Sequence, residues 1–146
     1  MVSGYFIPPA DFETAGHYQG KAASKISAAG YPMGFIVAPI MIYPDWKKEY
    51  AELFDRLKQQ IDWQKSGQPV TFELIQHRFT TTAKGFILNR FPHTKLDMDE
   101  AQRSMKWGKY GRFKYVYPKE TANEIKTYIS ALIMERFPEA VIKYFT

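Results

Sequence analysis

A continuous apolar run from residue 33 to residue 42 constrains the fold of this 146-residue chain more than any other feature. The run reads Met-Gly-Phe-Ile-Val-Ala-Pro-Ile-Met-Ile and shows no alternation of apolar with polar residues. Such runs are typical of strands that are covered on both faces, as in parallel sheets flanked by helices. The sequence therefore predicts a buried strand of a parallel sheet.

A strongly amphipathic helix is predicted directly after this strand, over residues 44–61. Pro44 suits its first turn, because the N–H that proline lacks has no helical partner there. Apolar side chains recur at spacings of three and four residues, which places them on one face of the helix. They are Trp46, Tyr50, Leu53, Phe54, Leu57 and Ile61.

Helices and strands alternate through most of the chain, after an irregular start of 17 residues. This alternation predicts an α/β fold of βα units with parallel strands, in a single domain of residues 1–146. These strands are too few to close a barrel. We therefore expect the sheet to have an exposed apolar edge beside the 34–42 or the 70–76 strand. The further helices are predicted over 18–29, 80–91 and 120–137, and the further strands over 70–76 and 140–145. The inward residues of the last two helices are predicted to be Ala83, Ile87, Leu88 and Phe91, and Ile125, Ile129, Leu132, Ile133 and Phe137.

An acid-free segment between the last two helices, residues 106–118, combines five aromatic residues, four cations and two glycines. Positive charge attracts a phosphate backbone, and flat rings stack on bases. The segment therefore predicts a nucleic-acid-binding β-hairpin over residues 105–118, and the net charge of +5 agrees with an acidic partner. The alternative is a hairpin whose rings pack on the core while its lysines are solvated, because cross-strand aromatic pairs are common in sheets. The candidate phosphate contacts are Lys106, Lys109, Arg112 and Lys114, and the candidate stacking rings are Trp107, Tyr110 and Tyr115.

Several kinds of chemistry are excluded by what the sequence lacks. It contains no cysteine, so it offers no disulfide and no thiolate metal ligand. No histidine pair has metal-binding spacing, and neither a phosphate-binding P-loop nor a GxSxG nucleophile motif is present. The chain shows neither the pattern of a secretory signal nor an apolar run of the roughly 20 residues that span a membrane, so we expect a cytoplasmic protein.

Polar residues at the end of the 70–76 strand form a second candidate site. Gln76, His77 and Arg78 follow one another there, and the C-terminal ends of parallel strands are where sites form in α/β folds. The alternative is a histidine that only satisfies hydrogen bonds at a strand-to-helix turn. His17 and His93 are predicted to lie on the surface, and the acidic cluster at 97–100 is predicted to start a helical turn. Thr121 and Glu124 have the spacing of a helix capping box.

Four sequence blocks together resemble the C-terminal portion of the spore photoproduct lyase family. They are Ala-Ala-Gly-Tyr-Pro at 28–32 with Gly-Phe-Ile-Val-Ala-Pro-Ile at 34–40, Thr-Phe-Glu-Leu-Ile-Gln-His-Arg-Phe-Thr at 71–80, the aromatic-basic segment, and Tyr-Phe-Thr at 144–146. The resemblance covers nearly everything after about residue 28, whereas residues 1–27 match poorly. It implies a radical S-adenosylmethionine enzyme that reverses the methylene-bridged thymine dimer of ultraviolet-irradiated spore DNA.

The resemblance also implies a fold and cofactor contacts. The family fold is a partial (β/α)₆ barrel with a DNA-contacting hairpin, which places residues 106–118 on that hairpin. The resemblance places Gly34, Ile36 and Ala38 on the strand beside the adenine of S-adenosylmethionine. A small residue there lets the strand backbone approach a ring closely. For the complete enzyme, S-adenosylmethionine and a [4Fe–4S] cluster are implied.

The departures from the family concern the cluster and the hairpin. The family's CxxxCxxC motif and its hydrogen-donating cysteine, both of the N-terminal half, are absent, and such clusters need thiolate ligands. Lys109 stands where the family usually has arginine, and Arg112-Phe113 replaces a small, glycine-containing pair. We therefore expect the C-terminal half of the enzyme as a separate polypeptide that is inactive alone and acts on DNA with an N-terminal partner half in the spore interior. Four alternatives remain: a stand-alone nucleic-acid-binding module, a decayed remnant, a truncated chain, and an interaction protein whose basic hairpin is incidental.

Overall fold

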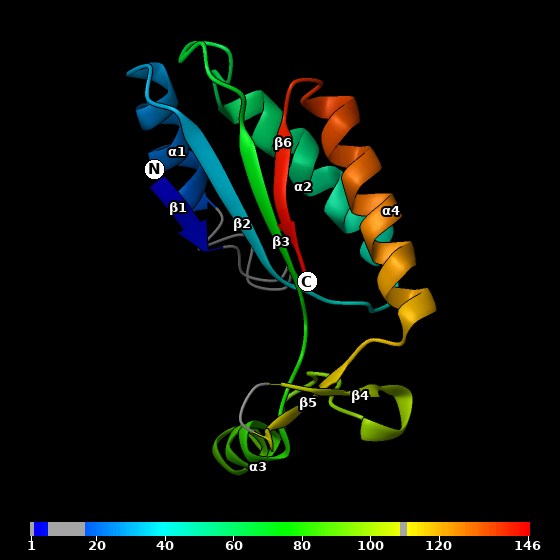
Figure 1. The fold of residues 1–146 in the computed structure, drawn as a ribbon. Coiled ribbons are helices and arrows are strands. Elements are labelled where there is room, and N and C mark those ends of the chain that lie inside the picture. The colour runs from blue at the N-terminus through cyan, green and yellow to red at the C-terminus, as the bar shows by residue number, and fades with distance from the viewer. Residues whose placement is uncertain (1, 6–16, 109–110) are drawn as a thin grey trace.

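The computed structural model describes residues 2–5, 17–108 and 111–146, and side chains from residue 20 onward within these ranges. Its elements form a four-stranded sheet with helices and, beyond one end of this sheet, a smaller unit with a two-stranded hairpin (Figure 1). In chain order they are β1 (Val2–Tyr5), α1 (His17–Ala28), β2 (Met33–Ile40), α2 (Trp46–Gln60), β3 (Thr71–Gln76), α3 (Thr81–Arg90), the 3₁₀ helix η3 (Glu100–Gln102), β4 (Ser104–Trp107), β5 (Phe113–Val116), α4 (Lys119–Arg136) and β6 (Val141–Phe145).

The main sheet has the strand order β1-β2-β3-β6, and every neighbouring pair is parallel. This confirms the predicted parallel α/β fold. Two details were wrong. The start of the chain is not irregular throughout, because β1 pairs with β2 although its four residues carry no strand pattern. The predicted apolar edge is also misplaced, because β2 and β3 are the central strands and β1 and β6 form the edges.

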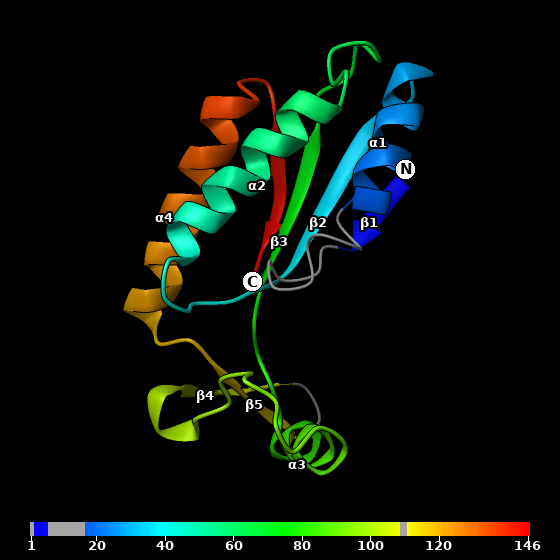
Figure 2. The same ribbon diagram turned by 180° about the vertical axis from the view of Figure 1, so that it is seen from behind.

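Three helices, α1, α2 and α4, cover one face of this sheet (Figures 1 and 2). The rings of Phe54 and Phe137 pack against Phe72 of β3, with ring centroids 5.9 and 5.5 Å away. The inward residues predicted for α4 are all buried, and five of the six predicted for α2 are buried as well. The sixth, Leu57, packs against the core while partly exposed. We call these strands and helices the sheet unit.

The opposite face of the sheet, which we call the open face, carries no helix among the described residues and is turned toward the viewer in Figure 1. Among the described residues, helices therefore cover β2 on one face and not on both faces as predicted. The strand register explains the continuous apolar run: Phe35 of β2 lies beside Phe72 on the helical face, so the alternate residues Gly34 and Ile36 lie on the open face. Their partners on β3 there are Thr71 and Glu73. The open face of β2 carries the glycine and the isoleucine rather than charged residues, so the strand reads as apolar throughout.

Residues 79–116, which we call the hairpin unit, contain α3, η3, β4 and β5 and lie beyond one end of the sheet (Figure 1). The helix α3 is present as predicted, but two of its predicted inward residues are exposed, Leu88 by 43% and Phe91 by 58%. No described residue buries that side of the helix, because α3 packs on the small hairpin and not on the main core. Ala83 and Ile87 are half-buried, in agreement with the prediction.

The ends of two helical elements test the local predictions. Asp99 accepts a hydrogen bond from the N–H of Ala101 at 3.0 Å, so the acidic cluster does start a helical turn, η3. The predicted capping box is wrong, because α4 begins at Lys119 with Pro118 as its N-cap and without a side-chain cap. In the part of the chain that the structure describes, no helix has the length and apolar character needed to cross a membrane.

Candidate nucleic-acid interface

The aromatic-basic segment forms the predicted hairpin, with β4 and β5 antiparallel. The N–H of Gly108 donates to the carbonyl of Arg112 at 2.6 Å, and a Cβ at position 108 would lie only 3.1 Å from that oxygen. Gly111 has a φ of 68°, a conformation that glycine adopts at little cost. These two glycines fit the tight turn, and Arg112 is exposed beside it. The candidates Lys109 and Tyr110 lie outside the described residues.

The alternation of rings and cations separates them onto opposite faces of the hairpin. Side chains that are directly opposite in an antiparallel pair share a face, and successive residues of a strand point to opposite faces. Trp107 lies opposite Phe113, whereas Lys106 lies opposite Lys114. One side, which we call the ring face, therefore carries the aromatic residues. The other, which we call the cationic face, carries the lysines.

The ring face is a continuous series of side-chain contacts. Trp107 contacts Phe113 edge-on with ring centroids 5.6 Å apart, and Phe113 contacts Tyr115 at 5.6 Å. Tyr115 stacks on Phe79 at 5.3 Å, and Phe79 stacks on His77 at 5.8 Å. Phe79 also exchanges two backbone hydrogen bonds with Tyr115, so the segment after β3 is joined to β5 by an isolated antiparallel bridge. Tyr115 is thus already stacked within the protein, whereas Trp107 remains 67% exposed.

The cationic face holds Lys106, Lys114 and Arg78. Arg78 directly precedes Phe79, so it points away from the ring face and lies diagonally from Lys114. Burial lowers the pKa of Lys114, and the nearby charges of Arg78 and Lys106 lower it further. Among the described residues, none of the three cations forms an ion pair with a carboxylate.

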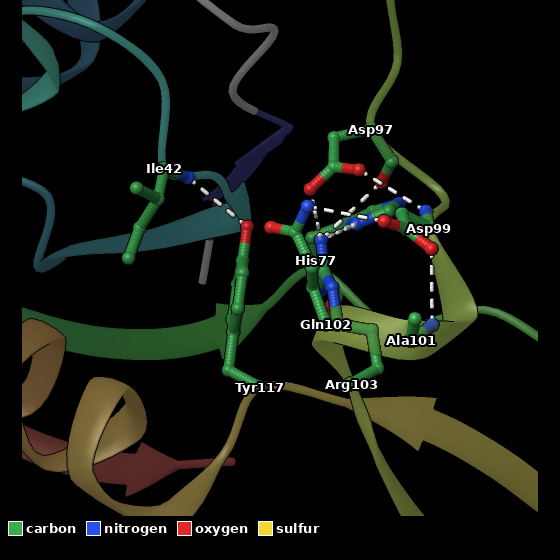
Figure 3. Close-up of polar contacts among 8 residues, drawn as sticks. All are labelled: Ile42, His77, Asp97, Asp99, Ala101, Gln102, Arg103 and Tyr117. Atoms are coloured by element: carbon green, nitrogen blue, oxygen red, sulfur yellow. Dashed lines mark hydrogen bonds and ion pairs between the residues drawn. The ribbon is translucent and has the colours of Figure 1, made fainter.

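A buried arginine joins the hairpin unit to the sheet unit (Figure 3). The side chain of Arg103 is 1% exposed, and its guanidinium donates to the carbonyl of His77 at 3.2 Å and to Asp97 at 3.3 and 3.4 Å. Its guanidinium carbon lies over the ring of Tyr117, 3.8 Å from the centroid. The hydroxyl of Tyr117 in turn accepts a hydrogen bond from the N–H of Ile42, just after β2. We call His77, Asp97, Arg103 and Tyr117 the joint.

Burial lowers the pKa of His77 to about 4, with the adjacent Arg103 guanidinium as the second cause and the Asp97 carboxylate opposing. His77 is therefore neutral at pH 7, and its backbone N–H donates to the carbonyl of Ile40 at 2.8 Å.

The structure divides the three residues predicted as a site at the end of β3 among three places. Gln76 donates to the carbonyl of Ala122 at 3.2 Å and holds α4, His77 belongs to the joint, and Arg78 reaches Thr146 at 3.3 Å on the cationic face.

Arg103 was not among the residues predicted from the sequence. A signal was present: Arg103 directly precedes β4 in an extended conformation and is two residues before Met105, so it is in phase with the ring face and not with the lysines. The other predicted site residues, Gly34, Ile36 and Ala38, lie along β2, with the first two on the open face. In the described ranges, no group of three histidine or acidic side chains could hold a metal ion.

The comparisons with known proteins identify the family. The spore photoproduct lyase family model matches residues 5–146. The spore photoproduct lyases of Geobacillus sp. (strain Y412MC61) and Bacillus subtilis (strain 168) are 47% and 46% identical over 126 residues, which is 86% of this chain. These residues make up 37% and 36% of the two relatives, so the chain spans little more than a third of their length.

Solved structures agree with this match. Spore photoproduct lyase complexed with dinucleoside spore photoproduct superimposes with a TM-score of 0.90 at 39% identity, over 99% of this chain and 44% of that one. A mutant of spore photoproduct lyase with bound AdoMet and dinucleoside spore photoproduct superimposes with a TM-score of 0.88. The likeness extends over both the sheet unit and the hairpin unit, and the chain belongs to the spore photoproduct lyase family.

Proposed function

We propose that this chain supplies the later barrel strands and the DNA-binding hairpin of a spore photoproduct lyase, which repairs the thymine dimer of spore DNA. The observation that carries the proposal is the superposition on the lyase that is complexed with dinucleoside spore photoproduct. Residues 1–146 act as a single domain, in which the segment 105–118 contacts DNA. The family implies that this happens in the spore interior.

Lys106, Lys109, Arg112 and Lys114 contact phosphates in this proposal, and Trp107 and Tyr110 are the rings that stack on bases. Tyr115 has a different part, because its ring is already stacked on Phe79 and supports the hairpin from within. The exposure of Trp107 leaves a large ring available at the free end of the hairpin. Stacking of a base on such a ring is worth roughly 1–3 kcal/mol.

The two cofactors of the family fit this chain differently. Gly34, Ile36 and Ala38 would line the adenine side of bound S-adenosylmethionine, because small side chains on a strand leave room for a flat ring. A [4Fe–4S] cluster needs thiolate ligands, and the 146 residues contain no cysteine, so these residues do not fit a cluster. The cluster ligands and the hydrogen-donating cysteine therefore belong to an N-terminal half, and this chain does not catalyse the reaction alone.

The experiment combines this chain with a polypeptide that carries the part of the Bacillus subtilis relative that it does not match, about two thirds of that protein. Under anaerobic conditions with S-adenosylmethionine and a reductant, we expect lesion reversal in the mixture and none with either polypeptide alone. Salt-dependent binding of the chain alone to labelled DNA is the second measurement. DNA binding without reversal in the mixture would favour the stand-alone binding module. The absence of both would contradict the proposal.

A further inference from the structure

The cationic face contains a pair of like charges that the hairpin itself does not explain. Lys106 and Lys114 are directly opposite across β4 and β5, a placement that destabilises a sheet. Among the described residues no carboxylate forms an ion pair with either lysine. The ring face of the same hairpin has its one buried cation, Arg103, balanced by Asp97. The unbalanced pair on the cationic face therefore indicates a site for an external anion.

Arg78 extends this pair into a group of three cations. Its guanidinium donates to the hydroxyl of Thr146, the last residue of the chain as described, at 3.3 Å. This hydrogen bond holds the side chain at the end of β6 and leaves further N–H donors free to bind, since a guanidinium has five. Burial is the main cause of the lowered pKa of Lys114, and the charges of Arg78 and Lys106 lower it further. An arginine fork with two ammonium groups matches the oxygens of a phosphate.

The position of the group relates it to the open face. Tyr144 lies opposite Glu73 on the open face of the sheet and is 49% exposed. Thr146, which accepts the hydrogen bond from Arg78, lies two residues after Tyr144, and its backbone continues the pairing of β6 with β3, so the cationic face and the open face meet at this end of β6. A phosphate bound there would lie between the hairpin and the sheet, and an attached nucleoside could extend over the open face.

We propose that Arg78, Lys106 and Lys114 together bind one phosphodiester group of a DNA strand whose adjacent nucleoside lies toward the open face of the sheet. This inference rests on the proposed function, because it takes DNA as the ligand. It adds Arg78, which belongs to the sheet-to-hairpin connection, to the DNA contacts. It also separates the phosphate contacts from Trp107, which lies on the other face.

The test measures fluorescence anisotropy of a labelled single-stranded oligonucleotide at several salt concentrations. The variants are Arg78→Gln, Lys106→Gln, Lys114→Gln and the triple variant, and Lys58→Gln on the exposed side of α2 is the matched control for the loss of one charge. The triple variant should reduce the slope of log affinity against log salt by about one, because one phosphate contact is lost. Each single variant should reduce it by part of this amount, and the control should leave it unchanged. Melting temperatures check that the variants are folded, and Arg78→Lys should retain most of the slope because it retains the charge.

A second oligonucleotide series replaces one phosphodiester at a time with a neutral methylphosphonate. At one linkage, the substitution should weaken binding to the wild-type chain about tenfold and have no effect on the triple variant. Two results would overturn the inference while the proposed function stands. In the first, the variants of the group show the same salt slope as the Lys58→Gln control. In the second, each methylphosphonate weakens binding to the wild-type chain and to the triple variant equally at every linkage.

Inorganic phosphate is the third probe, and its binding is monitored by the NMR chemical shifts of residues 78, 106 and 114. Weak binding at millimolar concentration agrees with a site built for a phosphodiester of a longer strand. Binding of inorganic phosphate as tight as that of the oligonucleotide would assign the site to free phosphate and overturn the inference. If the wild-type chain binds no DNA at any salt concentration, the proposed function and this inference both fail.

Discussion

Phe72 in the sheet unit is fully buried among other aromatic rings, whereas every residue of β4 in the hairpin unit is exposed. The sheet unit is stabilised by apolar burial between β3 and the helices α2 and α4. The hairpin unit is held by a row of ring contacts and by the polar joint around Arg103. The proposed contact with DNA would require the hairpin unit to keep its surface accessible, so burial of that surface could not stabilise it.

This contrast predicts that the two units respond differently to mutation. Substitutions in the sheet unit should unfold the whole chain, because its core is shared by strands and helices from both ends of the sequence. Substitutions in the joint should change the hairpin unit first, because the joint and the two chain connections, before Phe79 and after Val116, link this unit to the sheet. Local stability is known to vary in this way within one protein.

The largest effect is expected for Phe72→Ala. The ring of Phe72 lies within 6 Å of the rings of Phe35, Phe54 and Phe137, so its removal leaves a cavity at the centre of the core. We expect a loss of about 3–5 kcal/mol in the free energy of unfolding, measured by urea denaturation. Phe86→Ala on α3 is the matched control, because this ring is 73% exposed. Equal losses for the two variants would contradict the contrast.

The next effect is expected for Arg103→Leu. The substitution leaves the carbonyl of His77 without its guanidinium donor and removes the contact with the ring of Tyr117. We expect a loss of about 3 kcal/mol that is confined to the hairpin unit. Hydrogen exchange should accelerate for the amides of β4 and β5 and remain slow for those of β3. The exchange rates of Arg103→Lys should lie between those of the wild-type chain and those of Arg103→Leu, because lysine keeps the charge but lacks the planar fork. Uniform acceleration in both units would show that the joint does not act locally.

These two predictions also show what the sequence could and could not provide. The apolar spacing in α2 and α4 identified the buried side of each helix, because helix periodicity alone determines which residues share a face. The same rule failed for α3, since Leu88 and Phe91 satisfy the spacing but have no core to pack against. The presence of a packing partner depends on the tertiary arrangement, which periodicity does not contain.

The candidate site divides in the same way. The hairpin itself was predictable from the rings, cations and glycines of one short segment. The separation of Trp107 from Lys106 onto two faces was available from strand alternation as well, although the prediction named the two only as contacts of one hairpin. The joint was not available, because Arg103 meets His77, which lies 26 positions away in the sequence. Contacts between distant segments require the fold.

A third, smaller effect is expected from pH, through His77. Its pKa in the folded chain is about 4, compared with the ordinary histidine value of 6.5 in the unfolded chain. Between these values the unfolded chain binds a proton that the folded chain does not, so stability is complete above pH 6.5 and declines as the pH falls toward 4. We expect a loss of about 2 kcal/mol between pH 7 and pH 5 from this group. His77→Gln should lack this component in urea denaturation at the two pH values. If His77→Gln shows the same pH dependence of stability as the wild-type chain, the prediction about His77 is contradicted.

The smallest effect on stability is expected for Trp107→Ala, at the free end of the ring face. Trp107 is 67% exposed, and the one ring contact that the structure gives it is the edge-on contact with Phe113, so we expect a change of less than about 0.5 kcal/mol in the free energy of unfolding. If this ring stacks on a base, the same variant should lose roughly 1–3 kcal/mol of DNA binding while its salt dependence stays unchanged. Phe113→Leu is the control, because it removes the neighbouring ring but keeps an apolar side chain.

A loss of DNA affinity in Trp107→Ala without a loss of stability would show that the exposed end of the ring face belongs to the interface. A loss of stability without a loss of affinity would instead show that Trp107 is structural, as in the alternative in which the rings only support the hairpin. The comparison with Lys106→Gln separates the two faces, because that lysine lies beside Trp107 in sequence but on the other side of the sheet. The lysine variant should lower the salt slope and the tryptophan variant should not, since only the lysine releases a counterion from the phosphate backbone. A strand of DNA that touches both must therefore pass around the end of the hairpin.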